Sequence, residues 1–381
     1  MKNFRKTKAI VNLDAFRRNL EFIKSMTSSS KQFFCPMVKS NAYGHGDIEL
    51  TRVCEDVGVS GVGVALLEEG IRLRKAGISL DIFVFGPILD SAVTHLFDYQ
   101  LTPVIGQWPE LLAMEKLLGG REFSLHLKFN TGMNRLGFNP QESESLLSFF
   151  RKHPNLKLTG VCTHLLRGDD IGKPESISDQ QIQDFESIIS YFSHFQPQVH
   201  LWNSSGWFAV QDLKTKYSQS FHWGVRPGIS IYGIQPLENK FFQELKPVMS
   251  IVSEIVTIQK VRKGETVSYG GMWQASKESL IGVVPIGYAD GYSRSFSNRG
   301  EMLIGGSRVP IRGIVCMDYT MVDLTDLNID PGRDLGKEVI LLGEQSDQKI
   351  TAEELAEMID TIPYEIITCI GQRVPREFKG H

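Results

Sequence analysis

The chain has 381 residues, of which 41% are hydrophobic and 22% charged. These values are typical of a globular protein with room for two domains. A formal net charge of −3 gives no electrostatic case for nucleic acid or an anionic membrane as a partner. The five cysteines are widely spaced without a CxxC pair, so we expect no disulfide framework, no metal site and a cytoplasmic location. No apolar run is long enough for a signal peptide or a membrane span.

Short apolar runs recur along the first 226 residues, each about the length of a buried strand. They lie at 33–39, 59–65, 81–86, 101–106, 124–130, 158–165, 198–205 and 222–226. Segments with helical periodicity separate most of them, at 49–57, 66–76, 110–118, 140–152 and 179–195. Alternating strands and helices indicate a parallel sheet. Eight such strands favour an α/β TIM (β/α)8 barrel over a doubly wound open sheet.

The pattern changes after about residue 240. Several β-rich runs are joined by turns that contain glycine, at 248–261, 279–289, 308–317 and 338–343. One clear helix is predicted, around 351–360, and Thr351 with Glu354 forms a capping-box pattern at its start. We therefore expect two domains, a barrel over residues 1–240 and a mostly β domain over residues 241–381.

Reactive side chains fall at the ends of the predicted barrel strands, where TIM barrels carry their active sites. These residues are Lys39, Lys128, Asn130, His164, Asn203, Ser204, Ser205 and Arg226. An arbitrary lysine is most often a surface residue, but Lys39 follows an apolar run that should be buried. Partial burial lowers the pKa of an amine and makes it a better nucleophile, which suits a Schiff base.

Two loops near the predicted eighth strand are candidates for a phosphate site, because TIM barrels often bind phosphate after strands seven and eight. Asn203 and Ser204 occupy the first loop, and residues 226–229 (RPGI) occupy the second. Small residues allow backbone N–H groups to reach an anion. Either loop alone is weak evidence, but together with Lys39 they indicate a site for a phosphorylated aldehyde.

The motif VKSNAYGHG at 38–46 resembles the cofactor-attachment signature of alanine racemases, which use pyridoxal 5′-phosphate. The resemblance runs nearly end to end. It continues in LKFNTGMNRLGF at 127–138, THLLRGDD at 163–170, HLWNSS at 200–205, VRPGISIYG at 225–233, VSYGGMW at 267–273, IGYADGYSR at 286–294, VCMD at 315–318 and YEIITCIGQRVPR at 364–376. The resemblance implies a barrel followed by a β domain, and a head-to-tail homodimer.

The resemblance also implies two catalytic bases. Lys39 would hold the cofactor and act on one face of the substrate, and Tyr269 from the partner subunit would act on the other. The cofactor site would be formed by Tyr43, His164, Asn203, Ser204, Arg226, Gly228, Ile229 and Tyr364. Arg135 and Met317, the latter also from the partner, would orient the substrate carboxylate. The implied supporting residues are His200 behind Arg226, Lys128, and Tyr288, Arg294 and Asp169 at a narrow entrance.

Arg226 carries a chemical consequence. A guanidinium stays charged and cannot accept a proton, so a pyridine nitrogen facing it should remain neutral, which disfavours transamination and favours quick reprotonation. Arg226 read by itself also fits a structural ion pair. Lys128 is either carbamylated, as the matching family lysine often is, or unmodified and paired with a carboxylate or interior carbonyl. The sequence leaves both readings open.

The predicted function is pyridoxal-phosphate-dependent racemisation of alanine by these two bases, which would supply D-alanine for the cell wall. Alternatives are a serine or broad-spectrum racemase of the same fold, a decarboxylase for a basic amino acid, and a non-catalytic pyridoxal-phosphate carrier. Two departures from the family pattern bear on this. Ser40 replaces the usual alanine, and residues 165–168 (LLRG) differ at the barrel mouth, which affects the expected shape of the entrance.

Overall fold

A computed structural model describes residues 4–89, 92–235 and 240–380. The described residues divide into two compact units. Residues 16–42 and 47–246 form the barrel unit, and residues up to 15, residues 43–46 and residues from 247 onward form the β unit. The helix α1 (Leu13–Ser25) and the short turn α2 (Lys39–Tyr43) each run across a point of division.

The barrel unit contains a parallel sheet whose strands follow one another in chain order. The strands are β2 (Val62–Val64), β3 (Ile82–Val84), β4 (Thr102–Ile105), β5 (Phe123–Lys128), β6 (Leu156–Cys162), β7 (Gln198–Trp202) and β8 (Gly224–Val225). Residues 34–37 close the barrel, because Phe34 bridges to Val225 and Met37 bridges to Gly63, both in parallel. The predicted eight-stranded barrel is thus confirmed. Its first strand is irregular because Pro36 has no N–H to donate.

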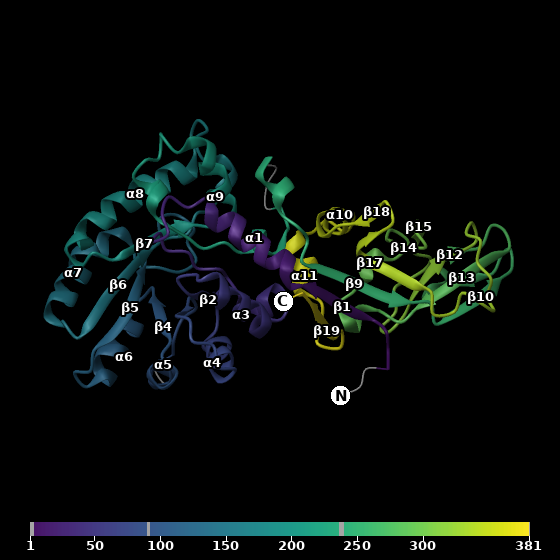
Figure 1. The fold of residues 1–381 in the computed structure, drawn as a ribbon, viewed down its shortest axis with the longest axis horizontal. Helices are drawn as coiled ribbons and strands as arrows, with labels where there is room; N and C mark the ends of the chain where they lie inside the picture. The colour runs from purple at the N-terminus through teal and green to yellow at the C-terminus, as the bar shows by residue number, and fades with distance from the viewer. Residues whose placement is uncertain (1–3, 90–91, 236–239, 381) are drawn as a thin grey trace. The chain divides into compact units, whose positions relative to one another are not determined.

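Helices cover the outside of these strands (Figure 1). They are α3 (Asp47–Val57), α4 (Leu67–Lys75), α5 (Val93–Asp98), α6 (Trp108–Leu118), α7 (Ser143–Lys152) and α8 (Ile177–Phe192). Their ends follow local chemistry: in α8, for example, the Ser176 side chain accepts a hydrogen bond from the Asp179 N–H. The five predicted helices are confirmed, whereas α5 and α9 (Ser204–Val210) were not predicted because both are short.

The β unit is built on a larger mixed sheet in the order β15-β14-β17-β9-β1-β19. Its strands are β1 (Lys8–Asn12), β9 (Met249–Glu254), β14 (Glu301–Ile304), β15 (Ser307–Pro310), β17 (Glu338–Gln345) and β19 (Arg376–Lys379), with β18 (Gln348–Ile350) beside β17. A second sheet holds β10 (Thr257–Val261), β13 (Ser279–Val284) and β16 (Thr320–Asp323), and β11 (Thr266–Val267) pairs with β12 (Trp273–Gln274).

The N-terminal strand corrects one expectation. Residues 1–240 were expected to form the barrel domain, but β1 pairs antiparallel with β9 and parallel with β19, and so belongs to the β unit. Its alternating burial suits a sheet with one buried face. The single predicted helix around 351–360 is present as α10 (Ala352–Met358), and a second helix, α11 (Pro363–Thr368), follows it. The Thr351 side chain caps α10 by accepting from the Glu354 N–H, whereas the Glu354 carboxylate binds Arg308.

Candidate active site

Lys39 lies half-buried directly after the first barrel strand, where the chain enters a left-handed turn. Four successive residues that are not glycine, Ser40 to Tyr43, have φ between 51° and 55°. This conformation costs on the order of 1–2 kcal/mol per residue, so the surrounding contacts must hold it. Burial lowers the pKa of the Lys39 amine, the nearby Arg135 charge lowers it further, and Glu69 partly opposes both. Burial and Arg135 thus shift the Lys39 amine in the direction of its free form, the direction expected from the sequence.

Glu69, which the sequence analysis did not single out, holds the backbone beside Lys39. Its buried carboxylate accepts hydrogen bonds from the N–H groups of Ser40 at 2.6 Å, Ala65 at 2.8 Å and Leu66 at 3.0 Å. The only signal in the sequence was a glutamate in the first turn of a predicted helix. Such a residue usually serves its own helix, and here it also fixes the strained turn.

Arg226 lies buried at the end of β8 and binds neutral acceptors. Its guanidinium donates to His200 Nδ1 at 2.7 Å and to the Thr163 carbonyl at 2.7 Å, with longer contacts to the Leu201 carbonyl and His164 Nδ1. None of these partners is a carboxylate. The hydrogen bonds of Arg226 therefore do not match the structural ion pair that the sequence left open. His200 stands behind Arg226, as the resemblance implied.

Positive charge accumulates at this end of the barrel. The pKa of His164 lies well below its usual value because of burial and because the charges of Arg226, Lys128, Arg135 and Lys39 disfavour a further proton. His164 is therefore neutral. An excess of positive charge of this kind suits an anionic ligand.

Ser204 joins the loops after β7 and β8. Its Oγ accepts from the Gly228 N–H at 2.9 Å and lies 2.9 Å from the Ser230 hydroxyl. Ile229 begins a short buried 3-10 turn in the second loop. Asn203 caps α9, with its Oδ1 accepting from the Gly206 N–H at 2.9 Å. The two loops predicted to bind phosphate thus meet, and backbone and hydroxyl donors converge there.

Lys128 and Arg135 line one cavity of about 210 Å³ together with Glu110. Lys128 is buried at the end of β5, which lowers the pKa of its amine, whereas Arg135 is exposed on a loop. The Glu110 carboxylate accepts from the N–H groups of Ile88 at 2.7 Å and Gly106 at 3.2 Å. Lys128 and Arg135 thus share the cavity with Glu110, whose carboxylate is hydrogen-bonded to backbone N–H groups.

Tyr43 and Tyr364 lie together within the β unit. Their ring centroids are 6.1 Å apart, and Tyr43 is buried while Tyr364, on α11, is half-buried. Burial raises the pKa of both phenols, that of Tyr364 to about 12. Both hydroxyls therefore keep their protons and can donate hydrogen bonds.

Tyr269 and Met317 are exposed on the β unit. Tyr269 opens a short 3-10 turn and is 71% exposed, and Met317 is 51% exposed. The Met317 carbonyl accepts from the Ala289 N–H at 3.1 Å. Gly287 makes this approach possible, because a Cβ there would lie 2.2 Å from the Cys316 carbonyl oxygen. The backbone at Met317 is thus held firmly while both side chains face solvent.

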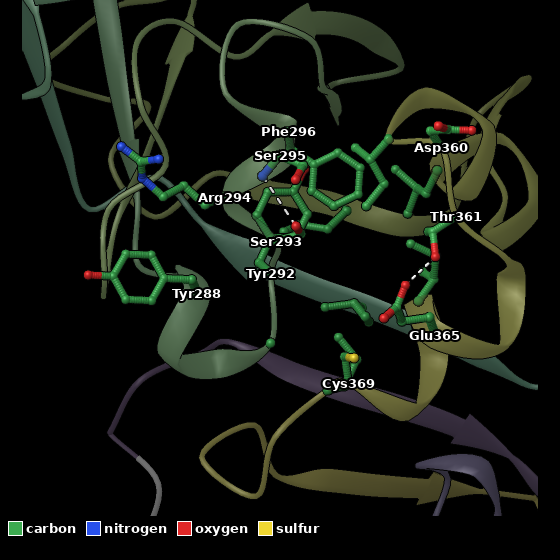
Figure 2. Close-up of a pocket in the computed structure, with 17 residues that line it drawn as sticks. Tyr288, Tyr292, Ser293, Arg294, Ser295, Phe296, Asp360, Thr361, Glu365 and Cys369 are labelled. Atoms are coloured by element: carbon green, nitrogen blue, oxygen red, sulfur yellow. Dashed lines mark hydrogen bonds between the residues drawn. The ribbon is translucent and has the colours of Figure 1, made fainter. Parts of the chain in front are cut away.

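The expected entrance residues lie in different units. Tyr288 and Arg294 line a cavity of about 590 Å³ in the β unit, and Figure 2 shows their side chains on one side of it, opposite Thr361 and Glu365. Asp169 lies in the barrel unit, exposed in a short 3-10 turn after β6 and directly after the unusual 165–168 segment. The shared role of these three residues at a narrow entrance stays a prediction.

Two further features of the described residues bear on the earlier expectations. No helix in the described ranges is both long and apolar enough to cross a membrane. Nor, within those ranges, do three or more His, Cys, Asp or Glu side chains gather as metal ligands.

Comparison with known proteins gives the family. The chain matches the model of the alanine racemase N-terminal domain over residues 11–236 and that of the C-terminal domain over residues 248–378. An alanine racemase of Sorangium cellulosum is 39% identical, covering 98% of this chain and 99% of the relative. The solved alanine racemase of Bacillus anthracis with bound L-Ala-P is 32% identical with a TM-score of 0.88, covering 100% of this chain and 97% of that chain. The alanine racemase of Bartonella henselae, solved with covalently bound pyridoxal phosphate, is 25% identical with a TM-score of 0.85. The match covers 98% of this chain and 99% of that chain.

Proposed function

Because the chain belongs to the alanine racemase family, we propose that it binds pyridoxal 5′-phosphate covalently at Lys39 and interconverts L- and D-alanine. The observation that carries the proposal is the half-buried Lys39, whose pKa is lowered, at the same end of the barrel as Arg226 and His164. D-Alanine for cell-wall synthesis would be its product in the cytoplasm.

The residues present fit a phosphorylated aromatic aldehyde. The charges of four basic side chains lower the pKa of His164. This positive potential would attract an anionic group such as a phosphate. Ser204 and Gly228 form a junction of small donors without a bulky side chain between them. These two residues would hold the phosphate, together with Asn203, Ile229, Tyr43 and Tyr364, and Lys39 would hold the aldehyde carbon.

The reaction needs a proton removed from one face of the α-carbon and returned to the other. Bound pyridoxal phosphate supplies the electron sink that makes the α-proton acidic. Lys39 Nζ, whose lowered pKa leaves it able to accept a proton, is the base on one face. Tyr269 Oη of a second chain is the base on the other, and neutral His164 is its proposed neighbour. Arg135 would hold the substrate carboxylate with the backbone of Met317.

Arg226 limits the chemistry to racemisation. Its guanidinium is a donor held by His200 and the Thr163 carbonyl, and it has no site that accepts a proton. Facing a pyridine nitrogen, it would donate a hydrogen bond and would not supply a partner that keeps that nitrogen protonated. Arg226 would therefore favour quick return of the proton over competing reactions such as transamination.

A second copy of the chain completes the proposed site. Tyr269 and Met317 are 71% and 51% exposed, so both side chains present at least half of their surface to solvent or to a partner. A head-to-tail homodimer would bring them to the partner's Lys39. Mixed dimers of Lys39→Ala and Tyr269→Phe chains should then recover one working site of two, and no recovery would refute a shared site.

The alternatives differ in substrate or in the absence of turnover. A serine or broad-spectrum racemase would keep the same chemistry, and a carrier without catalysis would not need Tyr269. In deuterated water, D- and L-alanine should each yield the other with deuterium at the α-carbon. Faster turnover of serine would displace alanine as the substrate, and absence of exchange with both would refute the racemase assignment.

A further inference from the structure

Three side chains form a buried chain of hydrogen bonds across the barrel interior. Arg226 donates to His200 Nδ1 at 2.7 Å, and His200 Nε2 lies 2.9 Å from His126 Nδ1. All three side chains are at most 5% exposed. The third member, His126 on β5, has no role in the proposed reaction.

The chemistry of the first member fixes the protons of the other two. A guanidinium only donates, so His200 Nδ1 must accept and its ring proton must sit on Nε2. That proton is then donated to His126, whose Nδ1 must in turn be unprotonated. Both imidazoles stay neutral, since burial and the Arg226 charge lower the pKa of His126 to about 3 and that of His200 well below its usual value.

Glycines on the neighbouring strands leave room for both imidazole rings. A Cβ at Gly160 on β6 would lie 2.4 Å from the His126 ring, and a Cβ at Gly224 on β8 would lie 2.7 Å from the His200 Cβ. Phe83 packs against His126 with ring centroids 4.8 Å apart, and Phe33 packs against His200 at 4.7 Å. These phenyl rings offer the imidazoles no alternative hydrogen-bond acceptor.

We propose that His126 is a positioning residue: by accepting the Nε2 proton of His200, it holds the His200 ring in the tautomer that Arg226 requires and thereby holds the orientation of Arg226. Without an acceptor at His126, the Nε2 proton of His200 would be buried without a partner. His200 would then turn or shift its proton to Nδ1, and Arg226 would lose its acceptor there. This inference rests on the proposed function where Arg226 faces the cofactor ring.

A matched pair of substitutions separates this role from simple packing. Asparagine and leucine have nearly the same size, and both leave the same space where the outer part of the ring was. His126→Asn keeps an acceptor near the Nδ1 position, and His126→Leu removes it. We expect His126→Leu to lower pyridoxal phosphate affinity or turnover by about 10- to 100-fold, the usual consequence of a buried donor without its acceptor, and His126→Asn to restore most of the loss. His194→Asn, on the exposed side of the barrel unit, is the control.

Nitrogen-15 NMR of the full-length, histidine-labelled protein with added pyridoxal phosphate reads the tautomers directly. The expected pattern is an unprotonated Nδ1 and a protonated Nε2 for His200, assigned by comparison with the His126 variants. A proton on His200 Nδ1, or equal losses in the Asn and Leu variants, would overturn the proposal. If the Leu variant does not fold, His126→Met, which also lacks an acceptor at the Nδ1 position, takes its place in the comparison with His126→Asn. If the protein takes up no pyridoxal phosphate, the proposed function fails while the tautomer remains measurable.

Discussion

Glu69→Gln tests how the strained turn beside Lys39 is held. The Glu69 carboxylate binds three backbone N–H groups, those of Ser40, Ala65 and Leu66. Glutamine has the same shape, but one oxygen becomes an NH₂ group that cannot accept. Whichever way the amide turns, at least one buried N–H faces another donor.

The expected loss follows from these bonds. A hydrogen bond to a charged group contributes about 1.5–3 kcal/mol, a neutral one about 0.5–1.5 kcal/mol, and an orphaned buried donor costs about 1–3 kcal/mol. We therefore expect Glu69→Gln to lower the free energy of unfolding by about 2–4 kcal/mol. The Glu69 charge also raises the pKa of Lys39, so its removal should lower that pKa further.

Urea unfolding of the wild-type and variant proteins measures the loss. Glu68→Gln is the control, because Glu68 is the adjacent residue in α4 and is exposed. The pH dependence of pyridoxal phosphate uptake gives the second readout, with a lower midpoint expected for Glu69→Gln. Surface substitutions usually change the free energy of unfolding by at most about 0.5 kcal/mol. If the unfolding free energies of the Glu69→Gln and Glu68→Gln proteins differ by no more than this, the reasoning is refuted.

Three further predictions concern the cofactor and substrate sites. Ser204→Ala should raise the dissociation constant for pyridoxal phosphate by about tenfold, the effect of one buried hydrogen bond, and equilibrium dialysis beside Ser205→Ala checks this. Arg135→Gln removes a charge that lowers the pKa of Lys39; uptake of pyridoxal phosphate, which needs the free amine, should shift its pH midpoint upward, and an unchanged midpoint would count against the electrostatic account. If Lys128 is carbamylated, ¹³C-bicarbonate should give a carbamate resonance that Lys128→Ala abolishes, and its absence would leave an unmodified amine beside Arg135.

The barrel and its strand-end residues were predictable because they depend on local patterns. Each parallel strand is a short apolar run, and the chain order of the strands is also their order in the sheet. The carboxyl ends of such strands meet at one end, which brings Lys39, His164 and Arg226 together without any knowledge of their contacts. The loops holding Ser204 and Gly228 follow the same logic.

Features that depend on distant pairings could not be predicted. Glu69 binds Ser40 across 29 positions, and His126 binds His200 across 74, and nothing local marks either pair. Strand β1 belongs to the β unit because its partners β9 and β19 lie far along the chain. The left-handed turn at Ser40–Tyr43 contradicts the preferences of its residues, so tertiary contacts must impose it.

The central claim is that Lys39 carries the cofactor, and one measurement tests it most directly. Purified protein incubated with pyridoxal phosphate and reduced with borohydride should carry a stable phosphopyridoxyl group, and peptide mass spectrometry should locate it on Lys39 and on no other lysine. A label on Lys128 or another amine, or no label at all, would contradict the account.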